Sequence, residues 1–136
     1  MYIVAGIKFT CSLSHAKKSF SRSVNAIFGN VLNSASNDVL IQLIKMKSLP
    51  ILMHGTEAIL LAKHQLSSLD FTVVRFFMKI LRTANRDYVT QYLNQNNFDL
   101  PSILWTRRFT VFKRKFESSD NLLCKSMLYN RSFSYL

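Results

Sequence analysis

Residues 66–82 read LSSLDFTVVRFFMKILR, and this stretch decides the fold class. Its apolar residues recur at the spacing of a helix and share one side, and they are Leu66, Leu69, Val73, Phe76, Phe77 and Ile80. Further apolar residues at 71, 74, 78 and 81 widen the stripe, so that little but Arg75, Lys79 and Arg82 is left to face water. Such a wide stripe predicts a helix covered by others over much of its surface, capped by Ser67 or Ser68.

Helical spacing also dominates the rest of the chain. We expect one helix from Ser12 or Ser14 to about Asn33, and a second that follows the capping cluster 34–38 and is kinked or ended by Pro50. Residues 51–61 are apolar nearly all round and predict the centre of the core, where Gly55 would allow helices to approach closely. Two further stretches predict helices, one over 87–97 and one from Pro101 to about Glu117.

The expected fold is therefore all-α, a bundle of about five to six helices with a short N-terminal β-strand stub. Residues 2–7 are β-prone but have no hairpin turn or partner run, so they should form a strand only if something outside the chain pairs with them. We divide the chain into a strand stub (1–10), a helical domain (11–117) and a loose C-terminal tail (118–136).

Composition excludes several classes of protein. The chain has 136 residues and 49% hydrophobic residues, which favours one folded domain over a disordered chain. Three Gly and two Pro argue against sheets with tight turns. The best candidate membrane span, 49–62, is too short and contains Pro50, His54 and Glu57, so we expect no transmembrane segment. With two distant cysteines and no secretory signal, the chain should be intracellular, nuclear or cytoplasmic and not secreted.

No set of residues predicts catalysis. The seven acidic residues are scattered singly, so no carboxylate cluster could hold catalytic metal ions, and we expect no enzyme activity, no metal and no cofactor. The three histidines lack the spacing of a helical ligand pair, and His54, inside an apolar run, is interpreted as a core residue with one hydrogen bond.

Charge points instead to a polyanionic partner. Eighteen Lys and Arg against seven Asp and Glu give a net charge of +11, which favours binding to an RNA or DNA backbone, with an acidic membrane surface second. In 101–117, aromatic residues line a side expected to pack, while cations fall more than a quarter-turn away. The candidate phosphate-contacting residues are Lys17, Lys18, Arg22, Arg75, Lys79, Arg82, Arg107, Arg108, Arg114 and Lys115.

Several runs of residues resemble a known family. They are FTCS (9–12), AKKSF (16–20), NAIFG (25–29), LIKMKSLPILMHGTEA (43–58), SLDFTVVRFFMK (68–79) and FDLPSILW (98–105), the last followed by Arg107 and Arg108. Together they resemble the region just after the reverse-transcriptase core in LINE-type (non-LTR) retrotransposon polyproteins. His54 stands where that family usually has tyrosine before the glycine.

The resemblance implies a helical thumb and its extension, which hold template and primer by their backbones. It implies that residues 1–10 are a stub left from a missing palm, and that a full-length relative would bind this region to its palm. The catalytic Asp-Asp motif of such polymerases has no counterpart here. We therefore expect a fragment of an RNA-directed DNA polymerase without activity. The alternatives are a basic interaction protein that docks on an acidic protein or membrane surface, and a relic with no function. A marginal core should make the chain self-associate.

Overall fold

The computed structural model of the chain describes residues 2–4, 10–31 and 34–126. Most of these residues are helical, which confirms the expected all-α class. The helices are α1 (Ser14–Val31), α2 (Asn37–Leu43), α3 (Leu49–Met53), α4 (Lys63–Ile80), α5 (Arg86–Gln95) and α6 (Pro101–Glu117). A π-helical turn (Ile44–Ser48) joins α2 to α3, and a 3₁₀ turn (Thr56–Ala58) precedes α4.

The N-terminal strand pairs within the chain. Strand β1 (Tyr2–Val4) runs antiparallel to β2 (Thr10–Ser12), with Ile3 opposite Cys11. The expectation that the strand needs a partner from outside was therefore wrong, because residues 10–12 serve as that partner. Residues 5–9, which join the two strands, lie outside the described residues.

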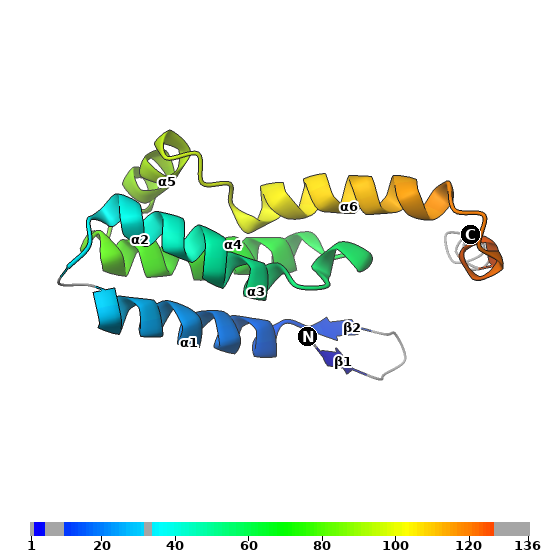
Figure 1. Cartoon of the computed structure of the whole chain (residues 1–136), viewed down its shortest axis with the longest axis horizontal. Coiled ribbons are helices and arrows are strands. Elements are labelled where there is room, and N and C mark those ends of the chain that lie inside the picture. Colours follow the sequence, from blue (N-terminus) through cyan, green and yellow to red (C-terminus); the bar gives the residue numbers. More distant parts are fainter. Residues whose placement is uncertain (1, 5–9, 32–33, 127–136) are drawn as a thin grey trace.

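Helix α4 is the centre of the fold, as its wide apolar stripe predicts. It packs against α1, α5 and α6, and Leu69, Val73 and Phe77 on it are fully buried. Figure 1 shows α1 and α6 running along opposite sides of α4, with α2 and α3 beside it. The helix begins at Lys63, before the expected serine caps, because the Gln65 side chain accepts a hydrogen bond from the Ala62 N–H at 2.9 Å.

Pro50 does not end the second helix. The chain stays helical from Asn37 to Met53, and the Leu49 N–H donates to the Ile44 carbonyl, five residues back, instead of to the carbonyl four back. Pro50 sits in the first turn of α3, where its missing N–H costs least. In an uninterrupted α-helix Met53 would lie about 180° from Ile44. The wide turn takes up roughly one extra residue, which reduces the rotation between Ile44 and Met53 by about 100°. Both side chains therefore reach the core.

Residues 51–61 do not form the buried segment that we expected. Helix α3 ends at Met53, and Gly55 adopts φ 72°, the left-handed conformation that glycine tolerates best, so its role is a turn and not close helix packing. Leu52 and Met53 are buried, but Ile51 and Leu60 are exposed. An apolar run interrupted by such a turn cannot present one continuous face to the core.

Two further helix starts are fixed by side chains. The Asn85 side chain accepts hydrogen bonds from the second and third N–H groups of α5, at 3.0 and 3.1 Å. At the start of α6 the acceptor comes from another helix, because Asp70 Oδ1 on α4 takes the Ser102 N–H at 2.8 Å. This bond ties α6 to α4, whereas Asp99, just before the helix, pairs with Arg107.

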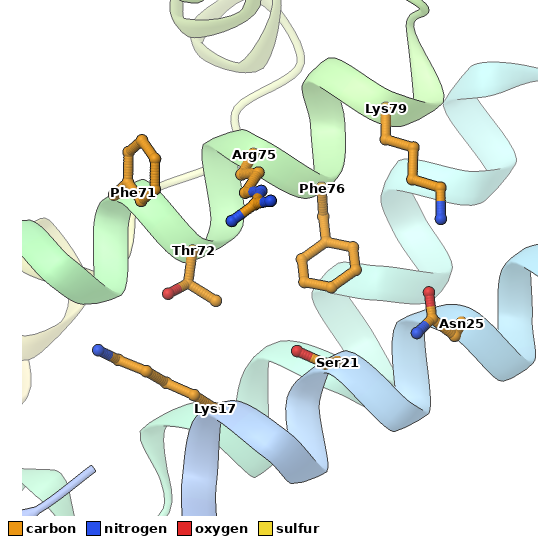
Figure 2. A pocket seen from close by; sticks show the side chains of 8 residues that line it. All are labelled: Lys17, Ser21, Asn25, Phe71, Thr72, Arg75, Phe76 and Lys79. Carbon is orange, nitrogen blue, oxygen red and sulfur yellow. The ribbon is translucent and has the colours of Figure 1, made fainter. Parts of the chain in front are cut away.

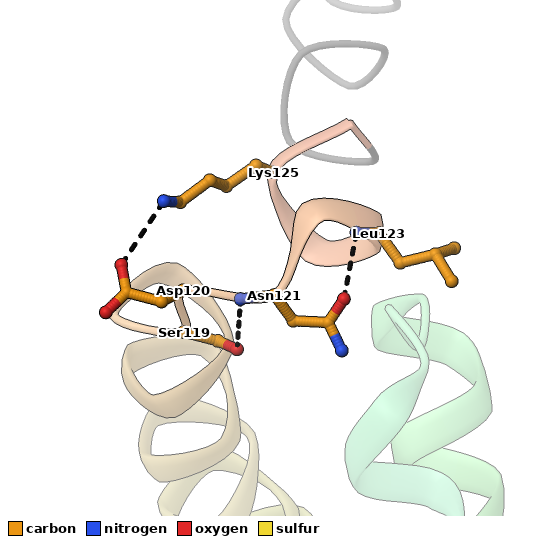
Figure 3. A network of polar contacts seen from close by, with 5 residues as sticks. All are labelled: Ser119, Asp120, Asn121, Leu123 and Lys125. Atoms are coloured by element: carbon orange, nitrogen blue, oxygen red, sulfur yellow. Dashed lines mark hydrogen bonds and ion pairs between the residues drawn. The ribbon is translucent and has the colours of Figure 1, made fainter.

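Local polar contacts organise the segment after α6 (Figure 3). Ser119 Oγ accepts the Asn121 N–H at 3.3 Å, Asn121 Oδ1 accepts the Leu123 N–H at 2.9 Å, and Lys125 pairs with Asp120 at 3.2 Å. Residues 122–126 form a short helical segment. The rest of the expected loose tail, 127–136, lies outside the described residues.

Candidate nucleic-acid interface

Three of the predicted cations meet in a groove between α1 and α4. Lys17, Ser21 and Asn25 line it from α1, at intervals of four residues that keep them on one side of the helix. Its volume is about 470 Å³, and its lining from α4 consists of Phe71, Thr72, Arg75, Phe76 and Lys79. Figure 2 shows Lys17, Ser21 and Asn25 of α1 across the groove from Thr72 and Phe76 of α4.

The groove has a positive lining without a carboxylate. Arg75 and Lys79 are exposed, and Lys17, half-buried, donates a hydrogen bond from Nζ to Ser68 Oγ. The Lys79 ammonium lies 5.5 Å from the centre of the Phe28 ring, a cation–π contact that keeps it beside α1. Each of these cations can still donate to an anion, because none of them forms an ion pair among the residues described.

The remaining cations of these two helices do not line the groove. Lys18 and Arg22 are exposed on α1, but each is one position, about 100°, away from a groove residue. Arg82 follows the end of α4 and adopts φ 51°. It is exposed at the turn toward α5 and no longer follows the helical spacing that placed it with Arg75 and Lys79.

The basic residues of α6 form a separate surface. Arg108, Arg114 and Lys115 are exposed, whereas Arg107 pairs with Asp99 at 3.1 Å. Because α6 lies across α4 from α1, these residues cannot join the groove (Figure 1). The ten predicted residues therefore belong to at least two surfaces.

The aromatic side of α6 packs less than we expected. Trp105 is buried and stacks on Phe109 with ring centres 4.7 Å apart, but no residue from 106 to 117 is buried. Phe112 stacks on Phe116 at 6.0 Å and remains 37% exposed. Figure 1 shows the reason: α6 runs past the ends of α3 and α4, so its second half has no helix to pack against among the described residues.

His54 is exposed, contrary to its interpretation as a core residue. It follows the last residue of α3 in extended conformation and lines a second groove of about 450 Å³, whose other residues are His15, Ala16, Ser19, Pro50 and Ile51. The helix ends one residue before His54 and the chain turns it outward. In the part of the chain described, no group of three His, Cys, Asp or Glu side chains is placed to hold a metal ion.

Sequence reasoning missed the uncharged members of the α1–α4 groove. Phe71 was assigned to the apolar stripe, yet it is 50% exposed beside Arg75, one helical turn away. Ser21 and Asn25 carried no signal of their own. Their spacing of four and eight residues from Lys17 is the pattern that could have revealed them.

No helix in the described part of the chain is both long enough and apolar enough to cross a membrane. Comparisons of the chain with protein-family models, with curated proteins and with solved structures found no match.

Proposed function

We propose that the chain binds nucleic acid through the phosphate backbone, with the α1–α4 groove as the contact surface. The observation that carries this proposal is the convergence of Lys17, Arg75 and Lys79, from two helices, on one groove without a carboxylate. A partner recognised in this way is anionic and is bound with little preference for base sequence.

The whole-molecule charge supports the same partner. With a net charge of +11, the chain attracts polyanions from a distance, and the groove supplies the place of contact. No acid lines the groove, and two of the seven acids have partners on α6. Asp70 accepts from Ser102, and Asp99 pairs with Arg107.

The test is a titration of the chain with RNA and with DNA at several salt concentrations. Each phosphate contact should contribute roughly −0.7 to −0.9 to the slope of log affinity against log salt. Changing Lys17, Arg75 and Lys79 together to Gln should flatten this slope by about 2 to 3 units.

A matched control removes the same charge from other places. Lys47, Lys63 and Arg86 are exposed, lie outside the groove, and also comprise two lysines and one arginine. Their replacement by Gln should leave most of the slope intact. If both triple variants weaken binding equally, the attraction comes from net charge alone and the proposal for the groove fails.

A second candidate function is docking on an anionic membrane surface through the second half of α6. The observation that favours it is the exposed Phe112, stacked on Phe116, on the same helix as Arg108, Arg114 and Lys115. A helix with aromatic and basic sides can lie in a lipid interface. Flotation with vesicles that contain anionic lipid tests this candidate: Phe112→Ser should reduce recovery with the vesicles while leaving nucleic-acid affinity unchanged.

Descent from a LINE-type reverse transcriptase stays a prediction based on the resemblance. The same holds for the expected absence of polymerase activity. An intact palm encoded directly upstream of a close relative, in the same reading frame, would support the descent. Metal-dependent primer extension by the purified chain, abolished by changing one of its own acidic residues, would contradict the predicted inactivity.

A further inference from the structure

We infer that the α1–α4 groove takes single-stranded nucleic acid, with one base stacked on the ring of Phe71. This inference rests on the proposed function and specifies its ligand. Its basis is the position of Phe71, a half-exposed aromatic residue in the lining of a groove whose charged residues are all cations. A basic groove with an aromatic platform is the arrangement that binds single strands, because it serves both the phosphates and the faces of unpaired bases.

The two phenylalanines of the groove have different surroundings. Phe76 is half-buried and packs edge-on against the fully buried Phe20, with ring centres 5.5 Å apart and an interplanar angle of 80°. Phe71 has no ring contact among the residues described, and half of its surface is open. Phe76 therefore has a packing role, whereas the exposed face of Phe71 is available to a ligand.

The cations lie where a strand stacked on Phe71 would pass. Arg75 is one turn after Phe71 and Lys79 is one turn further, so the three side chains follow one side of α4 over eight residues, about 12 Å. Lys17 lines the opposite wall. Ser21, Thr72 and Asn25 add uncharged hydrogen-bonding groups to the same groove, as Figure 2 shows.

A duplex fits this groove poorly. Two packed helices leave a depression of about 470 Å³, which is large enough for a few nucleotide groups and much too small for a double helix. The bases of a duplex are already stacked and paired, so they cannot present a face to Phe71. A duplex would therefore meet only the cations at the rim.

The experiment compares three labelled ligands of about 15 nucleotides by fluorescence anisotropy: oligo-dT, an abasic single strand and a duplex. The abasic strand keeps the phosphates and lacks the bases. The wild-type chain should bind oligo-dT about 5- to 150-fold more tightly than the abasic strand, the effect expected for one stacked base. Phe71→Leu should abolish this preference and leave affinity for the abasic strand unchanged.

Two further variants control for folding and for general aromatic contacts. Phe71→Trp keeps an aromatic face and should retain the preference. Tyr88→Leu removes an aromatic side chain of similar exposure, 52%, from outside the groove and should change nothing. Far-ultraviolet circular dichroism checks that each variant keeps its helices.

The outcomes separate the inference from the proposed function. The wild type could bind oligo-dT and the abasic strand equally, while the triple Gln variant of Lys17, Arg75 and Lys79 still flattens the salt slope. This result overturns the stacked base and leaves backbone binding in place. A preference for oligo-dT that Phe71→Leu does not reduce also overturns the assignment to Phe71. Absence of salt-dependent binding to all three ligands overturns both proposals.

Discussion

Trp105 connects the start of α6 to the turn before α4 by a buried hydrogen bond. Its indole Nε1–H donates to the Thr56 carbonyl at 2.9 Å, and Thr56 itself is fully buried, with its hydroxyl donating to the Met53 carbonyl at 2.8 Å. Trp105→Phe leaves the Thr56 carbonyl without this donor. We expect the free energy of unfolding to fall by about 1–3 kcal/mol, measured by urea denaturation followed by circular dichroism.

Phe109→Leu provides the comparison for Trp105. It removes the ring stacked on Trp105 but keeps the hydrogen bond. It should therefore cost less than Trp105→Phe. Equal losses would show that packing, and not the hydrogen bond, is what Trp105 contributes.

Tyr92 should make the fold sensitive to alkaline pH. Burial raises the pKa of its phenol above the ordinary value of 10.0, and the hydrogen bond to Asp38 Oδ1 at 3.1 Å and the charge of Asp38 raise it further. The neutral phenol is the form that the folded state favours. Its contribution to stability is therefore fully present below pH 10 and is lost as the pH rises through the higher pKa of the folded state.

Tyr92→Phe removes both the bond and this pH dependence. Urea denaturation on either side of pH 10 should show that the wild type loses more stability than the variant. Tyr88→Phe, on the same helix, is the comparison: the charge of Tyr88 is the smallest cause of the raised pKa of Tyr92, so this variant should keep most of the wild-type pH profile. A wild type and a Tyr92→Phe variant with parallel pH profiles would contradict the role of Tyr92.

The burial of single residues could be predicted where helical spacing places them on the side that faces the core. Leu69, Val73 and Phe77 lie on the predicted apolar stripe of residues 66–82 and are fully buried. His54 was not predictable in this way, because its environment depends on the residue at which α3 ends. The role of Asp70 was equally hidden, since its partner is 32 residues away in sequence.

At the scale of the elements, Asp70 should determine how firmly α6 begins. It is the side-chain acceptor for the N–H of Ser102 in the first turn of α6. Asp70→Ala removes that acceptor, and we expect unfolding to become easier by about 1 kcal/mol, as for other lost helix caps. Amide hydrogen exchange should show the first turn of α6 opening before α4 does.

Asp70→Asn tests whether the bond itself is responsible. The amide keeps an acceptor oxygen of the same reach, so most of the stability should return. If Asp70→Asn and Asp70→Ala destabilise the chain equally, Asp70 stabilises α6 through its negative charge and not through the hydrogen bond.

Element boundaries were predictable where local chemistry sets them. The expected ends of the first and last helices, Asn33 and Glu117, lie within two residues of the observed ends. The π-helical turn was not predictable, because its apolar pattern can be read as a helix that ends at Pro50. The pairing of β1 with β2 was missed because residues 10–12 do not form an apolar run of their own.

At the scale of the whole molecule, exposed apolar side chains on α6 should cause self-association. Ile103 is 47% exposed, and Val111 and Phe112, in the second half of α6, are 38% and 37% exposed. Light scattering should show that the mean mass rises with protein concentration. Replacing Val111 and Phe112 by Gln should reduce this rise several-fold.

The corresponding control changes two exposed apolar residues elsewhere. Val39 and Met46 lie on α2 and on the π-helical turn, and their replacement by Gln should leave the mass unchanged. A wild type that stays monomeric at high concentration would contradict the prediction, as would an equal effect of the two double variants.

Only part of the candidate site could be predicted from the sequence. Lys17, Arg75 and Lys79 were identified because cations at helical spacing mark a polar side. Their meeting depends on how α1 and α4 pack, which no local pattern encodes. The same packing places the candidate residues of α6 on another surface, and these are Arg107, Arg108, Arg114 and Lys115.

The π-helical turn also has a consequence for chain length. It contains one residue more than an α-helix needs to keep Ile44 and Met53 on the same side, so it behaves as a tolerated insertion. Deleting Met46, which is 72% exposed, should restore ordinary α-helical bonding without rotating the core residues. Such a deletion requires Pro50→Ala as well, because the proline ring would otherwise strike the carbonyl four residues before it. The extra residue of the π-helical turn and Pro50 thus depend on each other. We expect related chains to have both or neither.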